Sequence, residues 1–267
     1  MRLTRRNERL LKLASVATLA FIYLPLLVIL VYAFSASTTQ VWPPDGLTTK
    51  WFGEAFDNSG ARDAFLLSLE AAAFATTVAI VLGTLASMAV ARYRFFGRET
   101  ISFLVILPIA LPGIVTGVAL NTSFTQILGV ELSLFTIVVG HATFCIVVVY
   151  NNVVARLRRT SGSFEEASAD LGADTWQTFR LVTFPQLKTA LLAGGLLAFA
   201  LSFDEVIVTT FTAGADQTLP IWILNNLSRP NQLPIVNVVA VFVILLSMIP
   251  VYFAAKISND TTGGVGR

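Results

Sequence analysis

Charge is scarce in this sequence. Only 13% of its 267 residues are charged, whereas 55% are hydrophobic, and the mean hydropathy is +0.74. A composition this apolar excludes a soluble globular domain. The net charge of +2 is small and the basic residues lie in short clusters between apolar runs, which argues against a nucleic-acid-binding protein. We therefore expect an all-α integral membrane protein in a lipid bilayer.

Cysteine and histidine occur once each, as Cys145 and His141. A lone cysteine in an apolar run cannot form an internal disulfide, and without a Cys/His cluster we expect no metal site. A Ser/His/Asp hydrolase is disfavoured because the histidine lies in an apolar segment, where we expect it to hydrogen bond between helices. The sequence also lacks the Gly-x4-Gly-Lys-Ser/Thr phosphate loop. We therefore expect no catalytic residues and no cofactor bound by this chain.

Long apolar runs make up most of the chain. A hydrocarbon layer about 30 Å thick requires roughly 20 apolar helical residues, and six segments approach or exceed that length. Pro108, Pro112 and Gly113 interrupt the third segment, where we expect a kink beside a pathway or a packed neighbour. The sequence predicts a single transmembrane domain over residues 1–267. Its predicted spans are 14–34, 64–90, 101–122, 133–154, 189–211 and 235–255.

The lysine and arginine residues are distributed unevenly between the connecting segments. With the N-terminus inside, fifteen of the 18 lie on the inner side, and the exceptions are Lys50, Arg62 and Arg229. Basic connecting segments stay in the cytoplasm. We therefore expect both termini and the polar stretch 160–187 to be cytoplasmic.

Placing an acidic side chain inside a membrane costs free energy, so an acidic residue in a predicted span indicates a function or a specific partner. The fifth predicted span contains Asp204 and Glu205, and Glu70 lies near the outer end of the second. On a continuous helix Ser202, Glu205 and Thr209 would form one polar stripe, which we expect to line a substrate pathway open to the outside. Carboxylates without a basic residue in the same spans attract cations, and organic amines are natural candidates. Alternatively, the acids cap neighbouring helices or pair with an arginine of a partner subunit.

The polar stretch 160–187 carries the start signals of two short helices. Ser163 with Glu166 has the spacing of a capping box, and Asp174 with Gln177 has the same spacing. Each pair allows a side chain to satisfy an amide at the start of a helix.

Two residues in this stretch are expected to end those helices. Gly172 supplies the left-handed position after the first helix. Pro185 has no amide hydrogen and disfavours helical geometry in the preceding residue, so the second helix should end near Phe184. The sequence predicts a helix, a tight turn and a helix.

The same stretch contains a longer pattern. It reads Glu166-Ala167-Ser168, three residues, Gly172, nine residues, and then Val-Thr-Phe-Pro ending at Pro185. This resembles the EAA loop of ABC-importer permeases, written Glu-Ala-Ala-x3-Gly-x9-Ile-x-Leu-Pro, with Ser, Val and Phe in place of the usual Ala, Ile and Leu. The alternative is an amphipathic helix pair between spans, for which the Gly and Pro positions would have to match by accident.

In that family the loop is cytoplasmic and its short helix docks into a groove on an ATPase subunit. The resemblance implies a six-helix, type I importer permease of the MetI-like fold in a bacterial inner membrane. It also implies two copies of an ATPase that binds ATP and Mg, a second homologous permease subunit, and a periplasmic or extracellular substrate-binding protein. The ATPase-coupling residues that it implies are Glu165, Glu166, Ala167, Gly172, Ala173, Asp174 and Pro185.

The resemblance extends over nearly the whole chain to permeases of spermidine/putrescine-type importers. It implies inward transport of polyamines or a related organic cation by alternating access. Where relatives often carry an acidic residue in the third span, this chain has Gly113, which favours a different cation. The alternatives are a permease for another solute, an ion-gradient-driven secondary transporter and a scaffold subunit. The matching segments are residues 46–52, 92–95, 141–145 and 201–206.

Overall fold

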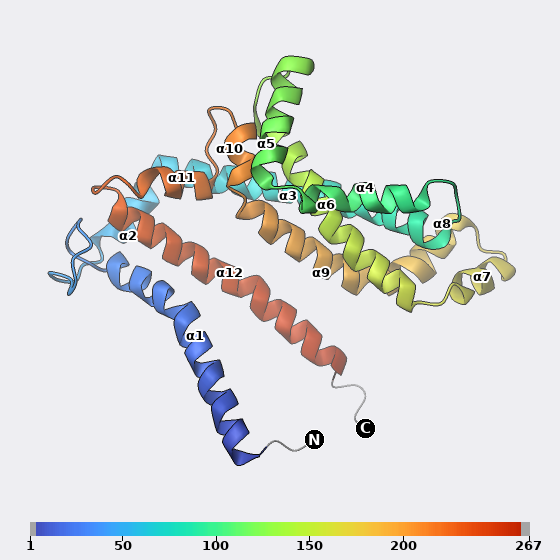
Figure 1. Cartoon of the computed structure of the whole chain (residues 1–267), viewed down its shortest axis with the longest axis horizontal. Helices are drawn as coiled ribbons and strands as arrows, with labels where there is room; N and C mark the ends of the chain where they lie inside the picture. Colours follow the sequence, from blue (N-terminus) through green and yellow to red (C-terminus); the bar gives the residue numbers. More distant parts are fainter. Residues whose placement is uncertain (1–3, 263–267) are drawn as a thin grey trace. The chain divides into compact units, whose positions relative to one another are not determined.

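The computed structural model describes residues 4–262, and the chain is built from helices (Figure 1). Its residue contacts divide it into two compact units. The first unit comprises the described part of residues 1–62 and 223–267, and the second is Asp63–Trp222. The helices are α1 (Arg5–Ala33), α2 (Lys50–Asp57), α3 (Ser59–Arg92), α4 (Arg98–Ala110), α5 (Gly113–Thr122), η1 (Ser123–Ile127), α6 (Leu134–Arg159), α7 (Ser163–Asp170), α8 (Thr175–Thr178), η2 (Phe179–Thr183), α9 (Phe184–Phe203), α10 (Ile207–Thr212), α11 (Leu219–Asn226) and α12 (Leu233–Thr262).

In the first unit α12 packs against both α1 and α2. The segment between α1 and α2 is held by Trp51, a buried residue whose indole Nε1 donates to the carbonyl oxygen of Ser35 at 2.7 Å. The ring centroids of Phe34 and Phe52 lie 4.9 Å apart beside this bond. The apolar stretch of α1, in contrast, has no buried residue. A helix that is apolar and uncovered in this way is suited to lipid.

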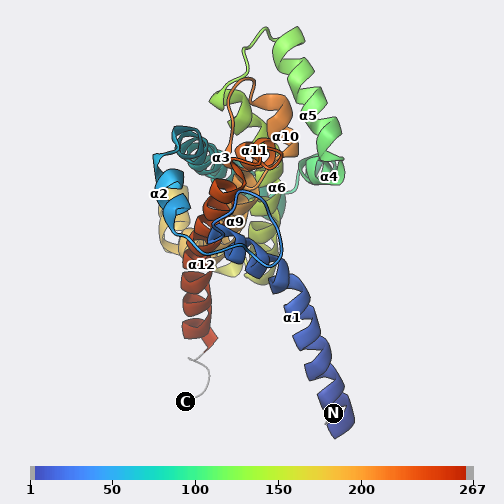
Figure 2. The same ribbon diagram turned by 90° about the vertical axis from the view of Figure 1, so that its left-hand side faces the viewer.

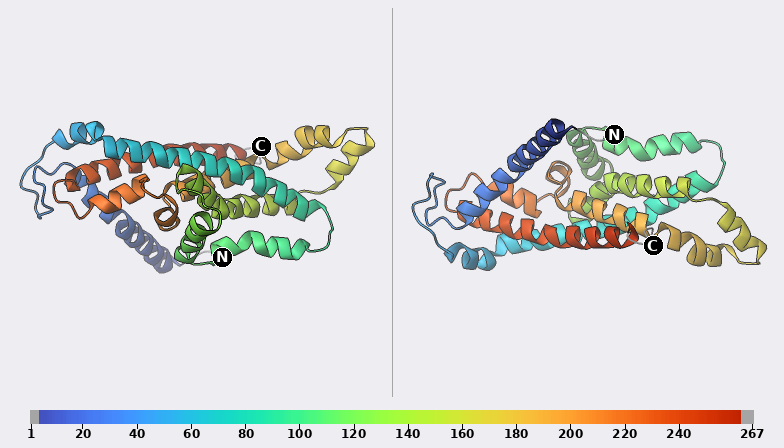
Figure 3. Two further views of the ribbon diagram at one scale, coloured as in Figure 1. Left: turned by 90° about the horizontal axis from the view of Figure 1, so that it is seen from above. Right: turned by 90° about the horizontal axis from the view of Figure 1, so that it is seen from below.

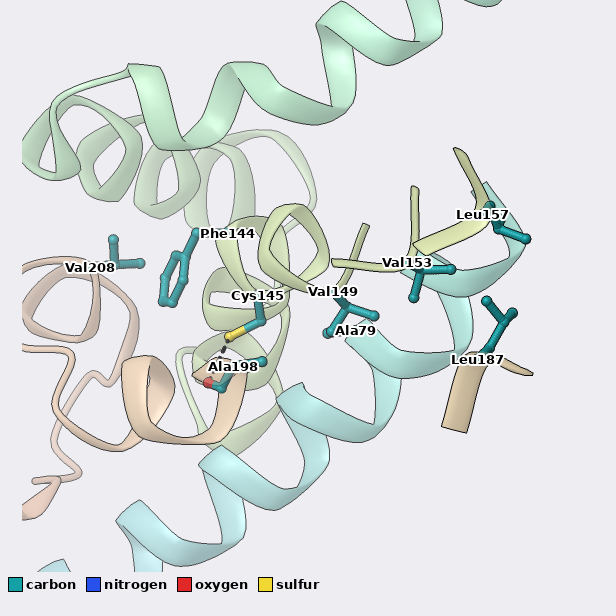
Figure 4. Close-up of a cluster of buried hydrophobic side chains, with 9 residues drawn as sticks. All are labelled: Ala79, Phe144, Cys145, Val149, Val153, Leu157, Leu187, Ala198 and Val208. Atoms are coloured by element: carbon teal, nitrogen blue, oxygen red, sulfur yellow. Dashed lines mark hydrogen bonds between the residues drawn. The ribbon is translucent and has the colours of Figure 1, made fainter. Parts of the chain in front are cut away.

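The core of the second unit lies between α3, α6 and α9. In the most apolar stretch of α6, 56% of the residues are buried, compared with 28% in the corresponding stretch of α3. α6 is therefore the central helix of this unit. Cys145 on α6 donates from Sγ to the carbonyl oxygen of Ala198 on α9 at 3.3 Å (Figure 4). The buried cluster around this contact contains Ala79, Phe144, Cys145, Val149, Val153, Leu157, Leu187, Ala198 and Val208.

Small residues allow α3 to approach α6 closely. A Cβ atom at Gly83 would lie 3.1 Å from both the carbonyl oxygen of Ile146 and the Cβ of Val149. One turn further, the buried hydroxyl of Ser87 donates to the carbonyl oxygens of Gly83 (2.6 Å) and Tyr150 (3.1 Å). Small residues and hydroxyl bonds of this kind hold helices together where lipid removes the hydrophobic driving force.

The described helices agree with most of the predicted spans. Four are long and apolar enough to cross a membrane, and a bent pair of helices could make a fifth. The sixth predicted span, 235–255, lies within α12 (Leu233–Thr262). The four long helices are Arg6–Ala33, Ser59–Arg92, Leu134–Arg159 and Thr175–Phe203.

The third predicted span is bent rather than straight. The axes of Arg98–Ala110 and Gly113–Ile127 differ by 104°, so the expected kink is confirmed, although residues 101–122 do not form one helix (Figure 2). Pro112 causes this break because it has no amide to continue the helix. Its carbonyl oxygen accepts from the amides of Val115 (2.9 Å) and Thr116 (3.2 Å), which starts α5 in a new direction.

We predict that Gly83→Leu lowers the free energy of unfolding by about 1–3 kcal/mol, because the larger side chain must separate α3 from α6. The measurement is thermal unfolding of the purified protein in detergent. Gly53→Leu on α2 is the matched control, since a Cβ there would meet no atom within 4 Å. Equal melting temperatures for the two variants would contradict the assigned packing.

Candidate functional site

The predicted coupling segment lies at one end of the second unit. In Figure 3, α7 and α8 (gold) lie at the same end of the second unit as the last turn of α3 and the start of α4. α7 follows the end of α6, and α8 continues through η2 into α9. The hydroxyl oxygens of Ser168 and Thr178 lie 3.0 Å apart and join α7 to α8. The segment is therefore a short helical hairpin attached directly to the base of α9.

The predicted capping box of Ser163 and Glu166 is wrong. Ser163 is the first residue of α7, and the cap position is taken by Gly162, which has no side chain to accept a hydrogen bond. The amide of Ser163 donates instead to Oγ of Ser161 at 3.2 Å. A hydroxyl two residues earlier thus performs the capping that the sequence pattern assigned to Ser163 itself.

The turn between α7 and α8 agrees with the sequence analysis. Gly172 has a φ of +84°, a conformation that favours glycine, and a Cβ there would meet no atom within 4 Å. The capping box of the next helix is confirmed. Asp174 Oδ1 accepts from the amide of Gln177 (2.8 Å), and Gln177 Oε1 accepts from the amide of Asp174 (3.0 Å).

The predicted helix end before Pro185 is wrong. The chain stays helical from Thr175 to Phe203, with η2 as a π-helical turn and Pro185 in the first turn of α9. A wide turn followed by a helix start accommodates a residue that has no amide hydrogen. The second helix of the hairpin and α9 are consequently one continuous element.

Most of the predicted coupling residues lie on the surface. A partner protein therefore has access to them in this chain. Glu165 and Ala173 are half-buried, and the exposed residues are Glu166, Ala167, Gly172, Asp174 and Pro185.

The same hairpin exposes large apolar side chains that the sequence analysis did not single out. Their signal was visible, since they are apolar residues within an otherwise polar segment. Phe164 and Leu171 lie outside the candidate membrane spans, where an exposed apolar surface indicates a protein-interaction site, whereas Trp176 and Leu181 lie within the helical run Thr175–Phe203. The side chains are Phe164 (58% exposed), Leu171 (90%), Trp176 (66%) and Leu181 (70%).

Glu165 differs from its neighbours because its carboxylate contacts other elements of the chain. Arg92, the last residue of α3, donates from Nε to this carboxylate, with 3.0 Å to Oε2. The hydroxyl of Thr183 in η2 donates to Oε1 at 3.2 Å. Arg92 Nη1 also donates to the carbonyl oxygen of Thr160 at the end of α6, at 3.5 Å. The sequence analysis missed Arg92, because residues 73 positions apart form no local pattern.

The fifth predicted span is not one continuous helix, so the expectation for 189–211 is wrong. α9 ends at Phe203 and α10 begins at Ile207, although neither glycine nor proline lies between them. Glu205 supplies the reason, since its Oε1 accepts from the amide of Val208 at 2.9 Å. A carboxylate that binds an amide near the start of α10 competes with continuation of α9.

We call residues 204–206, between α9 and α10, the acid corner. Asp204 is the residue after the last turn of α9 and is exposed, whereas Glu205 is half-buried and its carboxylate bonds to the backbone. The two carboxylates therefore have different surroundings. Asp204 is the more accessible of the two to a solute.

His141 on α6 joins the two sides of the acid corner. Its Nδ1 lies 2.8 Å from Oγ of Ser202 on α9, and its Nε2 lies 2.7 Å from Oγ1 of Thr209 on α10. All three residues are buried. The expected hydrogen bonding of His141 between helices is confirmed. Ser202 and Thr209 face α6 instead of forming the stripe of a continuous helix, and their place in a substrate pathway stays a prediction.

Glu70 is exposed on α3. α3 runs beside α9, since the rings of Phe65 and Phe203 lie 6.1 Å apart and a Cβ at Gly195 would lie 3.0 Å from Ile80. Glu70 lies between these two contacts along α3. This part of α3 therefore lies beside the half of α9 that ends at the acid corner.

We predict that His141→Leu lowers the free energy of unfolding by about 1–3 kcal/mol, because it leaves the buried hydroxyl of Ser202 without its partner. Thermal unfolding in detergent measures this loss. Thr143→Val is the matched control, since its hydroxyl donates only within α6, to Gly140 at 2.7 Å. The assigned bridge is contradicted if the control is destabilised as much as His141→Leu.

Comparison with known proteins identifies relatives along almost the entire chain. The family model described as "Binding-protein-dependent transport system inner membrane component" matches residues 79–262. The chain is 33% identical over 259 residues to the putrescine transport system permease protein PotI of Escherichia coli strain K12, covering 92% of this chain and 91% of that protein. It is 32% identical over 250 residues to the spermidine/putrescine transport system permease protein PotC of the same strain, covering 93% of each.

Solved structures show the same fold at lower identity. A bacterial ABC transporter involved in the import of the acidic polysaccharide alginate has a TM-score of 0.70 and 18% identity, covering 97% of this chain and 99% of that chain. The MetNI methionine ABC transporter in inward-facing conformations has a TM-score of 0.61 and 16% identity, covering 80% and 99%. The resemblance read from the EAA-like loop is thereby confirmed. The chain belongs to the binding-protein-dependent transport system inner membrane components, as a multi-pass permease subunit of an ABC importer whose ATPase is a separate subunit.

Proposed function

We propose that this permease carries putrescine, spermidine or a related organic cation into the cell. It would work with a second, homologous permease subunit, two copies of a cytoplasmic ATPase that bind ATP and Mg, and a substrate-binding protein on the outer side. The names of the relatives described above support polyamines as the substrate class. In this proposal the chain itself performs no chemistry on its substrate.

The acid corner is the observation that carries the substrate proposal. Two adjacent carboxylates, Asp204 and Glu205, lie where a membrane-spanning helix is interrupted, and no lysine or arginine occurs between Lys188 and Arg229. Acidic groups within a membrane-spanning segment favour a cationic ligand that offsets their charge. Asp204 presents an exposed carboxylate to such a ligand, and Glu205 fixes the corner through its bond to Val208.

The coupling hairpin supports ATP-driven alternating access as the mechanism. Its exposed apolar side chains would dock on the ATPase, so that closure of the ATPase pair moves α7 and α8. Because α8, η2 and α9 are continuous, this movement reaches the acid corner at the far end of α9. The cavity would open outward to receive the cation and return inward after hydrolysis.

A second candidate is a permease for a cation other than a polyamine. Gly113 favours it, because this chain has no side chain at the position where an additional acid would strengthen an amine site. A Cβ at Gly113 would lie 3.5 Å from Ile207, the first residue of α10, so this position is beside the acid corner. A secondary transporter is less favoured, since it would give the coupling hairpin no partner.

The experiment that tests the function is ATP-dependent uptake into vesicles that contain the full complex and its binding protein. Putrescine and spermidine are compared with an anion and a neutral amino acid. Amine-selective uptake that requires ATP supports the proposal. ATP-dependent uptake of another solute would support the importer function but reject an amine as the substrate. Uptake that does not depend on ATP would reject the coupling role of the hairpin.

We predict that Asp204→Asn lowers amine uptake roughly tenfold, equivalent to about 1.4 kcal/mol, because the exposed carboxylate contributes directly to cation binding. The measurement is the initial uptake rate as a function of substrate concentration, with assembly checked by co-purification of the ATPase. Glu131→Gln is the matched control, an exposed carboxylate outside the helices. Unchanged kinetics for Asp204→Asn would assign Asp204 to a structural role.

We predict that Gly172→Pro uncouples ATP hydrolysis from transport, because proline cannot adopt the φ of +84° that the turn between α7 and α8 requires. Uptake per ATP hydrolysed is the measured quantity. Gly97→Pro is the control, since Gly97 has the same φ and equally open surroundings but lies outside the hairpin. Normal uptake by Gly172→Pro would contradict the coupling role.

A further inference from the structure

The contact between Arg92 and Glu165 joins elements that the chain itself connects only over long distances. Arg92 ends α3, and Glu165 lies in the first turn of α7. Thr160 and Thr183 complete the group by accepting from the guanidinium and donating to the carboxylate, respectively. We call these four residues the Arg92 clamp. Through it α3, the end of α6, α7 and η2 meet at one point.

The clamp is shielded from water more than an ordinary surface ion pair. The side chains of Arg92 and Glu165 are 19% and 25% exposed, and Thr183 is buried. The exposed pair of Glu8 and Lys12 on α1 has side chains that are 54% and 74% exposed, although its atoms lie closer, at 2.7 Å. Exposed pairs of that kind contribute little, whereas a shielded, multiply bonded pair holds its geometry.

The position of the clamp gives it a mechanical consequence. The hairpin is continuous with α9 through η2, but α3 follows a separate path and is linked to α7 through this ion pair. A movement of α7 would reach α9 through the backbone and α3 through the clamp. α3 and α9 would then move together, although only α9 continues directly from the hairpin along the chain.

We propose that Arg92 and Glu165 are positioning residues that transmit the movement of the coupling hairpin to α3. This inference rests on the proposed coupling function and adds a role for Glu165 distinct from direct contact with the ATPase. Glu166, the next residue, is exposed and is the one left for the partner. Two adjacent glutamates thus have different roles in the hairpin.

The test uses the complete complex with three variants, Arg92→Glu, Glu165→Arg and the double charge exchange. We expect each single variant to lower uptake per ATP hydrolysed roughly tenfold while the ATPase still co-purifies, and the exchange to recover most of the loss, as expected for directly coupled residues. The same variants are scored for stimulation of ATP hydrolysis by the loaded binding protein. That readout requires a signal through the permease but does not depend on which solute is carried.

The control is the charge exchange of Glu8 and Lys12, which should leave both readouts unchanged. Arg92→Lys is a milder variant that keeps the charge but loses the guanidinium geometry, and we expect an intermediate loss with a normal melting temperature. Loss of ATPase co-purification in the single variants would overturn the proposal, because the clamp would then act in assembly. Failure of the exchange to recover activity, with a folded complex, would also overturn it. A wild-type complex without any ATP-dependent uptake would instead reject the proposed function.

Discussion

The structure depends on the requirement that backbone hydrogen-bonding groups in a membrane find partners within the protein. A continuous helix meets this requirement without help, so each interruption needs a specific partner. At Pro112 the proline removes an amide and its carbonyl oxygen receives the amides of the next turn. At the acid corner Glu205 supplies a side-chain acceptor to Val208. The interruptions are therefore the positions where the sequence places unusual residues.

The continuity of α8, η2 and α9 links the two candidate sites physically. Residues Thr175–Phe203 form one helical run of 29 residues, which spans roughly 43 Å at 1.5 Å per residue. The hairpin of α7 and α8 lies at one end of this run and Asp204 follows the other. A rigid helix transmits displacement along its length with little loss. The bridge of His141 to both sides of the acid corner then holds α9 and α10 to the central helix α6.

Hydropathy and spacing were sufficient to predict most of the membrane helices, the turn at Gly172 and the cap at Asp174. These features depend on interactions between residues close in sequence, so a sequence pattern is enough to predict them. The break after Phe203 could not be predicted in this way, since glycine and proline are absent there and a side-chain bond supplies the cause. The end expected before Pro185 was wrong because proline is also tolerated in the first turn of a helix. The Arg92 contact depends entirely on tertiary structure.

Glu165 and Glu166 show why residue type alone cannot assign a role within a motif. Both are glutamates in the first turn of α7, where a negative charge is favoured by the helix dipole. Successive residues of a helix point about 100° apart, so one faces the guanidinium of Arg92 while the other remains exposed. The hairpin thereby presents one acidic side chain to Arg92 of α3 and leaves the other exposed at its surface. In the proposed mechanism the hairpin needs the contact of Glu165 with Arg92 as well as its backbone connection to α9, because without that contact its movement would reach α9 but not α3.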